Sequence, residues 1–433
     1  MAIQALLAIL AVLLVLLFLG VPISYAIAVS SLTAILSSID LNVAVLTAAQ
    51  RTFVGMSKFS LTAIPFFILA GNIMNQGGIA KRLVDFVMSI LGKLPGALLV
   101  TNIGTNALFG AISGSASAAA AAVGSMIRDG AEEQGYDPAV TAATNAASSC
   151  SGLLIPPSNA LITYSLASGG TSVAALFMAG YIPGIIWAVC CCVVGVLLAV
   201  KLGYKGTPGR FDWKNLGICT MRALPSLSLI IVVIGGIVGG VFSATEGSAI
   251  AVVYSLILAF CYRSINLKSL WKIIVDSAKM SGMVVFLVGV SNILGWVMAF
   301  LQIPDTVAAL LLGLTNNKYI ILLIMNVILL VSGTFMDVTP AILIFTPLFL
   351  PICQSFGMST IQFGMILVYN LCIGNITPPV GNALFVGIKV GRTSLEKVMP
   401  YMLMYYVAII AGLLLVTYFP AVSMALPQLT GLA

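Results

Sequence analysis

Long stretches of unbroken apolar residues follow one another along the chain, as in 5–19 and 281–301, and they show no alternation of polar and apolar positions. Barrel strands alternate at every second residue, whereas a membrane-spanning helix needs about 20 consecutive apolar residues. Because hydrocarbon offers no partner to backbone polar groups, these runs predict helices. Membrane spans are predicted at about 4–20, 22–39, 61–77, 94–108, 173–199, 224–243, 247–262, 281–301, 319–331 and 399–418.

Three further regions are apolar enough for a membrane but are interrupted by Gly, Pro, Ser, Thr and Asn. Such breaks are tolerated at membrane depth only where the backbone is buried in protein or lines a cavity. The interruptions predict a re-entrant hairpin at 109–127 followed by a broken helix at 137–171, and a second hairpin at 332–351 followed by a broken helix at 357–388.

The two broken segments repeat each other. Segment 135–157 aligns without a gap with segment 357–379, at an offset of 222 residues. The identical pairs are Gly135/Gly357, Cys150/Cys372, Gly152/Gly374, Pro156/Pro378 and Pro157/Pro379. The chain therefore divides into predicted halves 1–222 and 223–433, and the expected fold is an all-α polytopic membrane protein of two inverted-topology repeats. Paired interruptions at corresponding positions of two halves indicate a transporter binding site.

Each Gly-x-x-x-Pro-Pro break suits the binding of ions. Proline has no N–H group, so a break at this element frees carbonyl oxygens, which are suited to a hard cation such as Na⁺. The half-helix beyond the break presents N–H groups and a positive dipole end to a carboxylate. Ordinary proline kinks with small-residue packing remain the alternative.

Composition excludes other classes of partner. Only 7% of the residues are charged and 61% are hydrophobic, whereas soluble domains carry about 25% charged residues. The net charge is +7, but the basic residues lie in short linkers such as 201–222 and 263–279, which indicates cytoplasmic loops rather than nucleic-acid binding. Segment 79–93 is expected to form an amphipathic helix at the interface. The N-terminus lacks a basic region, so the first helix is expected to be retained.

Cofactor and metal chemistry find no support in the sequence. There is no histidine, and the eight cysteines form no CxxC pair, so no transition-metal site is expected and the cysteines act as small hydrophobic residues. No phosphate-binding loop is present, so the energy must come from an ion gradient or from another chain.

At these residues the chain resembles the large membrane subunit of the tripartite ATP-independent periplasmic (TRAP) transporters. The matching stretches are Ala63-Ile-Pro-Phe-Phe-Ile-Leu-Ala-Gly-Asn72, Gly77-Gly-Ile-Ala-Lys-Arg-Leu83, Phe109-Gly-Ala-Ile-Ser-Gly-Ser-Ala116, Gly152-Leu-Leu-Ile-Pro-Pro-Ser158, Leu176-Phe-Met-Ala-Gly180, Met336-Asp-Val-Thr-Pro340 and Ile376-Thr-Pro-Pro-Val-Gly381. The resemblance implies a Na⁺-driven, elevator-type importer of the bacterial inner membrane. It also implies two partners, a small membrane subunit and a periplasmic binding protein that delivers a small carboxylate. Some members fuse the two membrane subunits, but this chain is too short for that, so a separate small subunit is expected.

The resemblance also implies the site residues. One Na⁺ site is expected at Gly333, Gly374, Thr377 and Val380, and the repeat places the other at Ala111, Ser113, Gly152, Ile155 and Ser158. The expected substrate-binding residues are Ser115, Asn159, Asp337, Thr339 and Asn382. The chain departs from many relatives in 118–122, where five alanines stand in a stretch that carries an acid elsewhere. Asp337 and Glu246 each allow two interpretations, a functional carboxylate or a helix cap, and for Glu246 the cap is favoured.

No Arg or Lys lies in the hairpin tips or the Pro-Pro segments, so a carboxylate is expected to be held by amides, hydroxyls and the co-transported cations. Overall similarity favours sialic acid weakly, with a C4-dicarboxylate or a sugar acid next. An enzyme is not expected, because histidine is absent and the acids are scattered. A channel with the Pro-Pro breaks as a filter and a stand-alone Na⁺/dicarboxylate symporter remain the alternatives.

Overall fold

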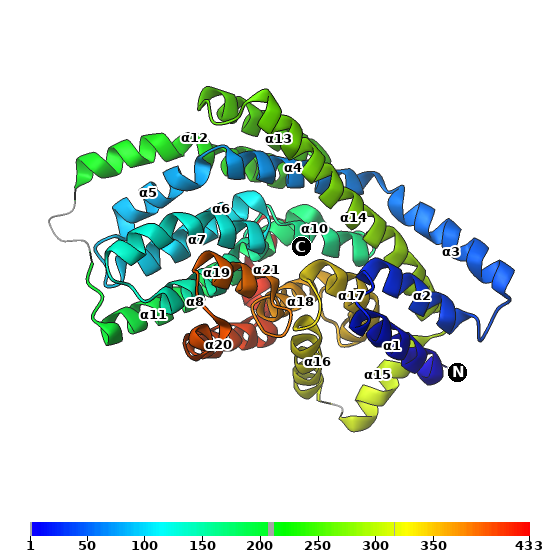
Figure 1. Ribbon diagram of the computed structural model, residues 1–433. Coiled ribbons are helices and arrows are strands. Elements are labelled where there is room, and N and C mark those ends of the chain that lie inside the picture. The colour runs from blue at the N-terminus through cyan, green and yellow to red at the C-terminus, as the bar shows by residue number, and fades with distance from the viewer. Residues whose placement is uncertain (1, 207–211, 316) are drawn as a thin grey trace.

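A computed structural model describes residues 2–206, 212–315 and 317–433, and these residues form helices without a strand (Figure 1). The first half contains α1 (Ala2–Phe18), α2 (Ile23–Ile35), α3 (Leu41–Met56), the short 3₁₀-helix η1 (Phe59–Thr62), α4 (Ala63–Gln76), α5 (Ile79–Leu91), α6 (Ala97–Ser113), α7 (Ala116–Glu133), α8 (Pro138–Ser149), α9 (Ser151–Leu154), α10 (Asn159–Ala167) and α11 (Val173–Leu202). The second half contains α12 (Trp213–Val238), α13 (Ala244–Cys261), α14 (Leu267–Phe300), α15 (Ile303–Leu314), α16 (Lys318–Gly333), α17 (Val338–Ser355), α18 (Thr360–Gly374), α19 (Asn382–Val390), α20 (Leu395–Tyr418) and α21 (Pro420–Leu429).

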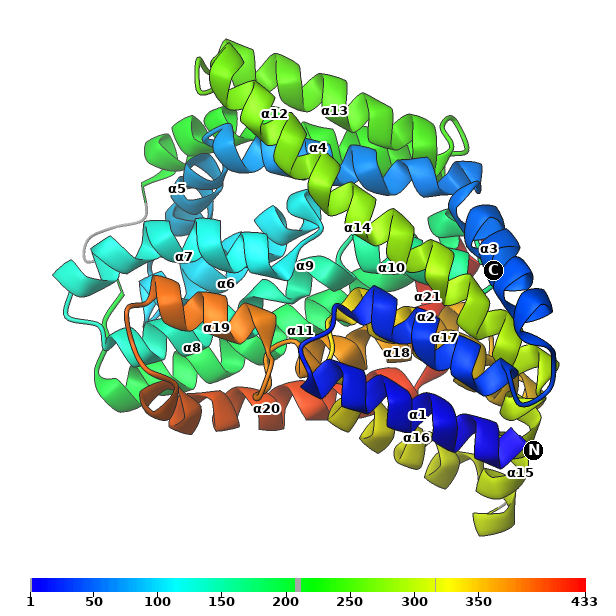
Figure 2. The ribbon, with the colours of Figure 1, turned by 45° about the vertical axis from the view of Figure 1, so that its right-hand side comes forward.

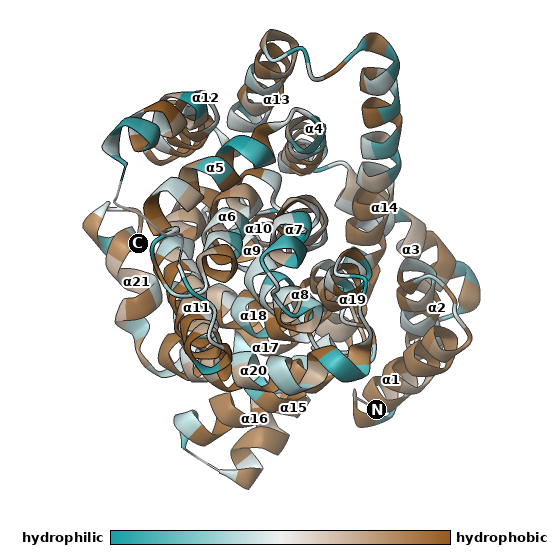
Figure 3. Ribbon diagram, turned by 60° about the vertical axis from the view of Figure 1, so that its left-hand side comes forward, coloured by the Kyte–Doolittle hydropathy of each residue, from teal (hydrophilic) through white to brown (hydrophobic). Residues whose placement is uncertain are grey.

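Six of the described helices are long and apolar enough to cross a membrane by length and composition: α11, α12, α13, α14, α17 and α20. Helices α3 and α4 meet the same test as one span bent by 60°. Large apolar side chains face outward, with Ile231 69% and Val407 73% exposed, as expected for a lipid-facing surface. Figure 3 shows α1 and α16 coloured as hydrophobic over most of their length.

Two predicted boundaries are wrong because capping and charge distort the apolar pattern. Helix α12 begins at Trp213, where the Asp212 carboxylate accepts hydrogen bonds from the N–H groups of Lys214 and Asn215, so the expected division at residue 222 falls inside this helix. Helix α14 begins at Leu267 rather than near 281, because its first turns carry exposed lysines. Arg210, part of the first basic linker, lies outside the described residues.

Both hairpins are longer than predicted. The first consists of α6 and α7, joined by a turn at Gly114, whose φ of 62° suits a residue without a side chain. The second consists of α16 and α17, joined by residues 334–337. The predicted spans at 94–108 and 319–331 are therefore the first arms of these hairpins. An apolar hairpin arm and an apolar span look alike in sequence, and only the polar tip distinguishes them.

The same order of elements occurs twice. The bent pair α3–α4, then α5, the hairpin α6–α7, the broken helix α8–α10 and α11 are matched by α14, α15, the hairpin α16–α17, the broken helix α18–α19 and α20. The predicted fold of two repeats, each with a hairpin and a broken helix, is confirmed. The predicted interfacial helix is α5, which buries Ile79, Leu83 and Val87 on one face.

The helices form two layers (Figure 2). The hairpins, the broken helices, α11 and α20 pack into a central bundle. Along one side of it lies an outer layer in which α14 packs against α2, α3 and α4, while α13 packs against α4, and α12 against α5. The first arm α6 and both broken helices are therefore largely surrounded by protein, which satisfies the condition for a broken backbone at membrane depth, whereas α16 exposes one face, with Leu323 46% and Val327 52% exposed.

Candidate functional site

The tips of both hairpins and both broken helices meet at one cavity of about 140 Å³. Its polar lining consists of Ser115 and Ser117 from the first tip, Asn159 and Thr163 from α10, Asp337 and Thr339 from the second tip, and Asn375 from the second break. Apolar residues of α4 and α14 complete the wall. No lysine or arginine is among the described residues that line it, so a bound anion must rely on hydrogen-bond donors and on other cations.

Four of the five predicted substrate-binding residues share this cavity: Ser115, Asn159, Asp337 and Thr339. Ser115 and Asn159 come from different elements, and the side-chain amide of Asn159 donates to the carbonyl oxygen of Gly114 at 3.5 Å. Asn382 does not line the cavity, because it is exposed at the start of α19. The hairpin tips bring the other four together from positions far apart in the chain.

Asp337 and Glu246 differ in their capping bonds. Asp337 stands at the N-cap position of α17, yet its exposed side chain makes no capping hydrogen bond. Glu246 forms a capping box, in which its carboxylate accepts from the Ser243 N–H at 2.8 Å and its own N–H donates to the Ser243 hydroxyl at 3.2 Å. The structural interpretation of Glu246 is therefore correct, and the capping interpretation of Asp337 is not.

The first predicted Na⁺ site lies where α6 packs against α9. A Cβ atom added to Gly152 would lie 2.1 Å from the Cα atom of Gly110, so the two backbones are in direct contact. The Ser113 hydroxyl donates to the carbonyl oxygen of Gly110 at 3.5 Å. The Ser158 hydroxyl donates to the carbonyl oxygen of Leu153. Backbone carbonyls from the hairpin and from the break are thus crowded together beside the cavity.

The second predicted Na⁺ site repeats this arrangement. A Cβ atom added to Gly374 would lie 2.4 Å from the carbonyl carbon of Gly333. The N–H of Val380 donates to the carbonyl oxygen of Thr334 at 3.1 Å, and the Thr377 hydroxyl donates to the carbonyl oxygen of Ile373 at 2.6 Å. The Pro-Pro peptide bond is cis in both copies. Hard cations prefer such oxygen ligands, and the assignment of Na⁺ to these positions stays a prediction.

Asn375 is a site residue that the sequence analysis did not select. It is 4% exposed, it lines the cavity, and its side-chain oxygen has no hydrogen-bond partner among the described residues. Its side-chain nitrogen donates to the Cys150 sulfur at 3.8 Å, which connects the two broken helices. Its position between Gly374 and the Pro-Pro pair is the sequence signal that could have identified it, because a polar side chain inside a break faces the same opening as the freed backbone.

Buried amides attach each hairpin to its broken helix. The Asn106 amide in α6 donates to the side-chain oxygen of Asn145 at 3.0 Å and to the Ser148 hydroxyl at 2.8 Å. In the second half, the Asn370 amide in α18 donates to the side-chain oxygen of Asn326 in α16 at 2.8 Å. Hydrogen bonds of this kind fix one packing of polar helices in a membrane. The hairpin tips are therefore held in register with the breaks.

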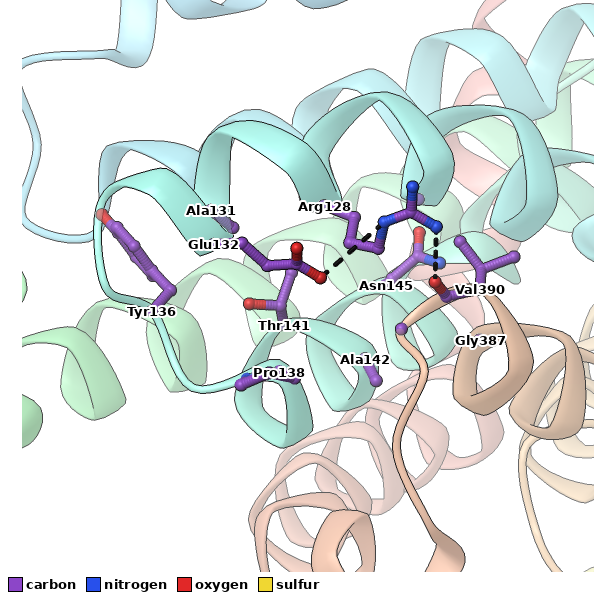
Figure 4. A pocket seen from close by; sticks show the side chains of 12 residues that line it. Arg128, Ala131, Glu132, Tyr136, Pro138, Thr141, Ala142, Asn145, Gly387 and Val390 are labelled. Atoms are coloured by element: carbon purple, nitrogen blue, oxygen red, sulfur yellow. Dashed lines mark hydrogen bonds and ion pairs between the residues drawn. The ribbon is translucent and has the colours of Figure 1, made fainter.

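Arg128 connects the two halves at another small cavity (Figure 4). This residue of α7 donates to the carbonyl oxygen of Val390, at the end of α19, at 3.3 Å, and it forms ion pairs with Asp129 at 2.7 Å and Glu132 at 3.8 Å. The volume of about 10 Å³ is no larger than one water molecule. The contact therefore joins the first hairpin to the second broken helix and does not form a ligand site.

Two re-entrant hairpins that meet two broken helices around a polar cavity define the membrane component of a secondary transporter. The sequence model of the family described as "Tripartite ATP-independent periplasmic transporter, DctM component" matches residues 10–422, and the chain belongs to this family. Proteins of this family work with a periplasmic binding protein and a small membrane subunit. The chain is accordingly a multi-pass protein of the bacterial inner membrane.

Several relatives are similar over most of the chain. The uncharacterized protein YgiK of Salmonella typhimurium is 49% identical over 95% of both chains. The isethionate TRAP transporter permease protein DctMQ of Oleidesulfovibrio alaskensis is 37% identical over 94% of this chain and 64% of that longer protein. The C4-dicarboxylate TRAP transporter large permease protein DctM of Pseudomonas aeruginosa is 36% identical over 93% of both. The sialic acid TRAP transporter large permease protein SiaM of Vibrio cholerae is 32% identical over 95% of this chain and 96% of that protein.

The fold also occurs in a solved transporter structure. The Alcanivorax borkumensis YdaH transporter, described as having an unusual topology, matches with a TM-score of 0.64, and the match covers 88% of this chain and 89% of that one. Its sequence identity of 15% extends the likeness to the fold alone.

Proposed function

We propose that this chain imports a small carboxylate across the inner membrane, driven by Na⁺, after a periplasmic binding protein has delivered the substrate. The observation that carries the proposal is the polar cavity between the two hairpin tips, whose described lining contains no lysine or arginine side chain. Beside it, at each break, a glycine of the hairpin touches a glycine of the broken helix. A carboxylate in such a cavity needs positive charge close by. Na⁺ ions at the two breaks supply it, and the binding of substrate is then coupled to the binding of the ions.

The two layers support an elevator-type motion. The central bundle contains both hairpins and both breaks. Among the described residues, the outer layer lines the cavity only with apolar ones, which are Met280 and Val284 of α14 and Ile64 and Ile68 of α4. A bundle that carries the whole polar site can move past an apolar wall without losing hydrogen bonds. The outer layer also offers a surface for a separate small membrane subunit, because α2 and α3 expose large side chains such as Tyr25, Val45 and Phe53.

The substrate class follows from the site and from the relatives together. Isethionate, C4-dicarboxylates and sialic acid, named for the relatives, are all small organic anions. Sialic acid is the first candidate of the sequence analysis, but the isethionate and C4-dicarboxylate relatives, at 37% and 36% identity, are more similar to this chain than the sialic acid relative at 32%. A cavity of about 150 Å³ holds a benzene ring, so the cavity of about 140 Å³ accommodates a C4-dicarboxylate or a small sugar acid more readily in this conformation.

Reconstitution tests the proposal. The chain is placed in liposomes with its small membrane subunit, and uptake of labelled sialic acid and of succinate is measured with and without an inward Na⁺ gradient and with and without the cognate binding protein. Uptake that needs both the gradient and the binding protein is the expected result. Na⁺-driven uptake that ignores the binding protein would identify a stand-alone symporter instead. Uptake without saturation or ion coupling would identify a channel.

A further inference from the structure

A second, larger cavity of about 390 Å³ lies between the outer layer and the central bundle. Its polar wall belongs to the outer layer and consists of Arg51, Lys58, Ser291, Asn292 and Trp296. The opposite wall is formed by apolar residues of α10 and α17. This space is the cationic cavity. It contains the basic side chains that the hairpin-tip cavity lacks.

The two cavities follow each other along the same three helices. On α10, Thr163 lines the hairpin-tip cavity and Leu166 the cationic cavity. On α14 the corresponding residues are Val284 and Val288, and on α17 they are Thr339 and Leu343. Each step is three or four residues, which is about one helical turn, or roughly 5.4 Å. One cavity therefore begins where the other ends, and the three helices form a common wall.

The two basic side chains are available to a ligand. Both are exposed, and neither forms an ion pair with an acid among the described residues. The guanidinium of Arg51 lies over the ring of Trp296, 5.6 Å from its centroid, which holds the cation at the cavity wall. Arg51 lies on α3, Lys58 follows the end of that helix just before η1, and both side chains line the same cavity. Arginine binds a carboxylate or a sulfonate through two parallel hydrogen bonds.

We propose that the cationic cavity is a second binding station for the transported organic anion, which Arg51 and Lys58 hold before it reaches the hairpin tips. The inference rests on the proposed function only for the chemical class of the substrate. Under the charge rule the basic segment 263–279, which includes the first turns of α14, lies at the cytoplasmic side, and the cavity is lined by the opposite end of α14. An anion released outside the membrane therefore meets this pair of cations first. The cation pair raises its local concentration.

The transport test compares two double variants in the complete complex. Arg51→Gln with Lys58→Gln removes the pair, and Lys268→Gln with Lys272→Gln removes the same charge from exposed positions at the other end of α14. Loss of the pair is expected to raise the substrate concentration for half-maximal uptake at least about tenfold. The maximal rate and the Na⁺ dependence stay unchanged, and the control variant behaves as the original protein. An unchanged half-saturating concentration in the first variant would overturn the proposal.

A binding test separates this proposal from the proposed function. Succinate is titrated into the purified complex without Na⁺, and the fluorescence of Trp296 is followed against a Trp296→Phe variant. Binding between Arg51 and Lys58 draws the guanidinium from the ring, so a saturable change is expected that disappears in the double variant and is weaker in Arg51→Lys, which keeps the charge but not the planar guanidinium. If the Trp296 fluorescence changes on succinate binding in a complex that shows no Na⁺-driven uptake, the second binding station is supported and the proposed coupling of uptake to Na⁺ is refuted. A change produced by phosphatidylglycerol vesicles and not by succinate would overturn the station in favour of a lipid site.

Discussion

Gly110 and Gly152 touch through their backbones, since a Cβ atom on Gly152 would lie 2.1 Å from the Cα atom of Gly110. Gly333 and Gly374 make the matching contact in the second half. The first member of each pair lies near the end of a hairpin's first arm, and the second lies just before a Pro-Pro break. Any side chain at Gly152 or Gly374 would separate hairpin from break and displace the carbonyl oxygens between them.

Alanine at Gly152 or at Gly374 is expected to raise the Na⁺ concentration for half-maximal uptake at least about tenfold, because a misplaced ion site loses more than about 1.4 kcal/mol of binding free energy. Na⁺ titration of uptake in proteoliposomes measures the effect. Gly217→Ala in α12 is the matched control, since no atom lies within 4 Å of the added Cβ. Equal Na⁺ dependence in all three variants would refute the predicted ion sites.

Asp337→Asn is expected to lower uptake at least about tenfold while the unfolding temperature stays unchanged, because this carboxylate lines the cavity and makes no capping hydrogen bond. Glu246→Ala is expected to lower the unfolding temperature and to leave uptake unchanged, because the variant removes the carboxylate that accepts the Ser243 N–H. Uptake and thermal unfolding of the solubilised protein are measured for both variants. A fall in the unfolding temperature of Asp337→Asn would return that residue to a structural role.

Asn375→Ala is expected to weaken substrate binding about five- to tenfold, the loss of roughly one hydrogen bond to a neutral group. The side chain is buried at the cavity, and its oxygen, which has no partner among the described residues, can accept a bond from a hydroxyl group of the substrate, such as a sugar acid carries. Half-saturating substrate concentrations are compared with those of Asn382→Ala, a matched amide that lies outside the cavity. A larger effect at Asn382 would mean that the cavity is not the substrate site in this conformation.

Arg128→Ala is expected to lower the unfolding free energy by about 1–2 kcal/mol, because it removes a charged donor from the carbonyl oxygen of Val390. Since α7 and α19 belong to different halves, the variant is also expected to expose α19 to faster amide hydrogen exchange. Lys397→Ala, an exposed basic residue on α20, serves as the control. Unchanged exchange in α19 would show that Arg128 does not hold the two halves together.

The sequence by itself determined the class of fold and the position of its breaks. Unalternating apolar runs predict helices because hydrocarbon leaves no other way to satisfy the backbone. The repeated Gly-x-x-x-Pro-Pro element located both broken helices, since proline and glycine act on the backbone locally. Four of the residues selected near the hairpin tips share one cavity for the same reason, because polar side chains at membrane depth gather where the helices are interrupted.

Only the tertiary structure decided which segments meet. It showed that the apolar stretches 94–108 and 319–331 are hairpin arms, since the arm of a hairpin and a complete span have the same composition. The sequence analysis did not predict helix α3, because Gln50 and Arg51 interrupt its apolar run. A role for Arg51 became visible only when the structure placed its guanidinium over the ring of Trp296 in α14. Contacts such as Gly110 with Gly152 and Asn375 with Cys150 depend on how distant helices pack. Local sequence periodicity specifies a helix, but which helices pair depends on how side chains distant in the sequence pack against one another.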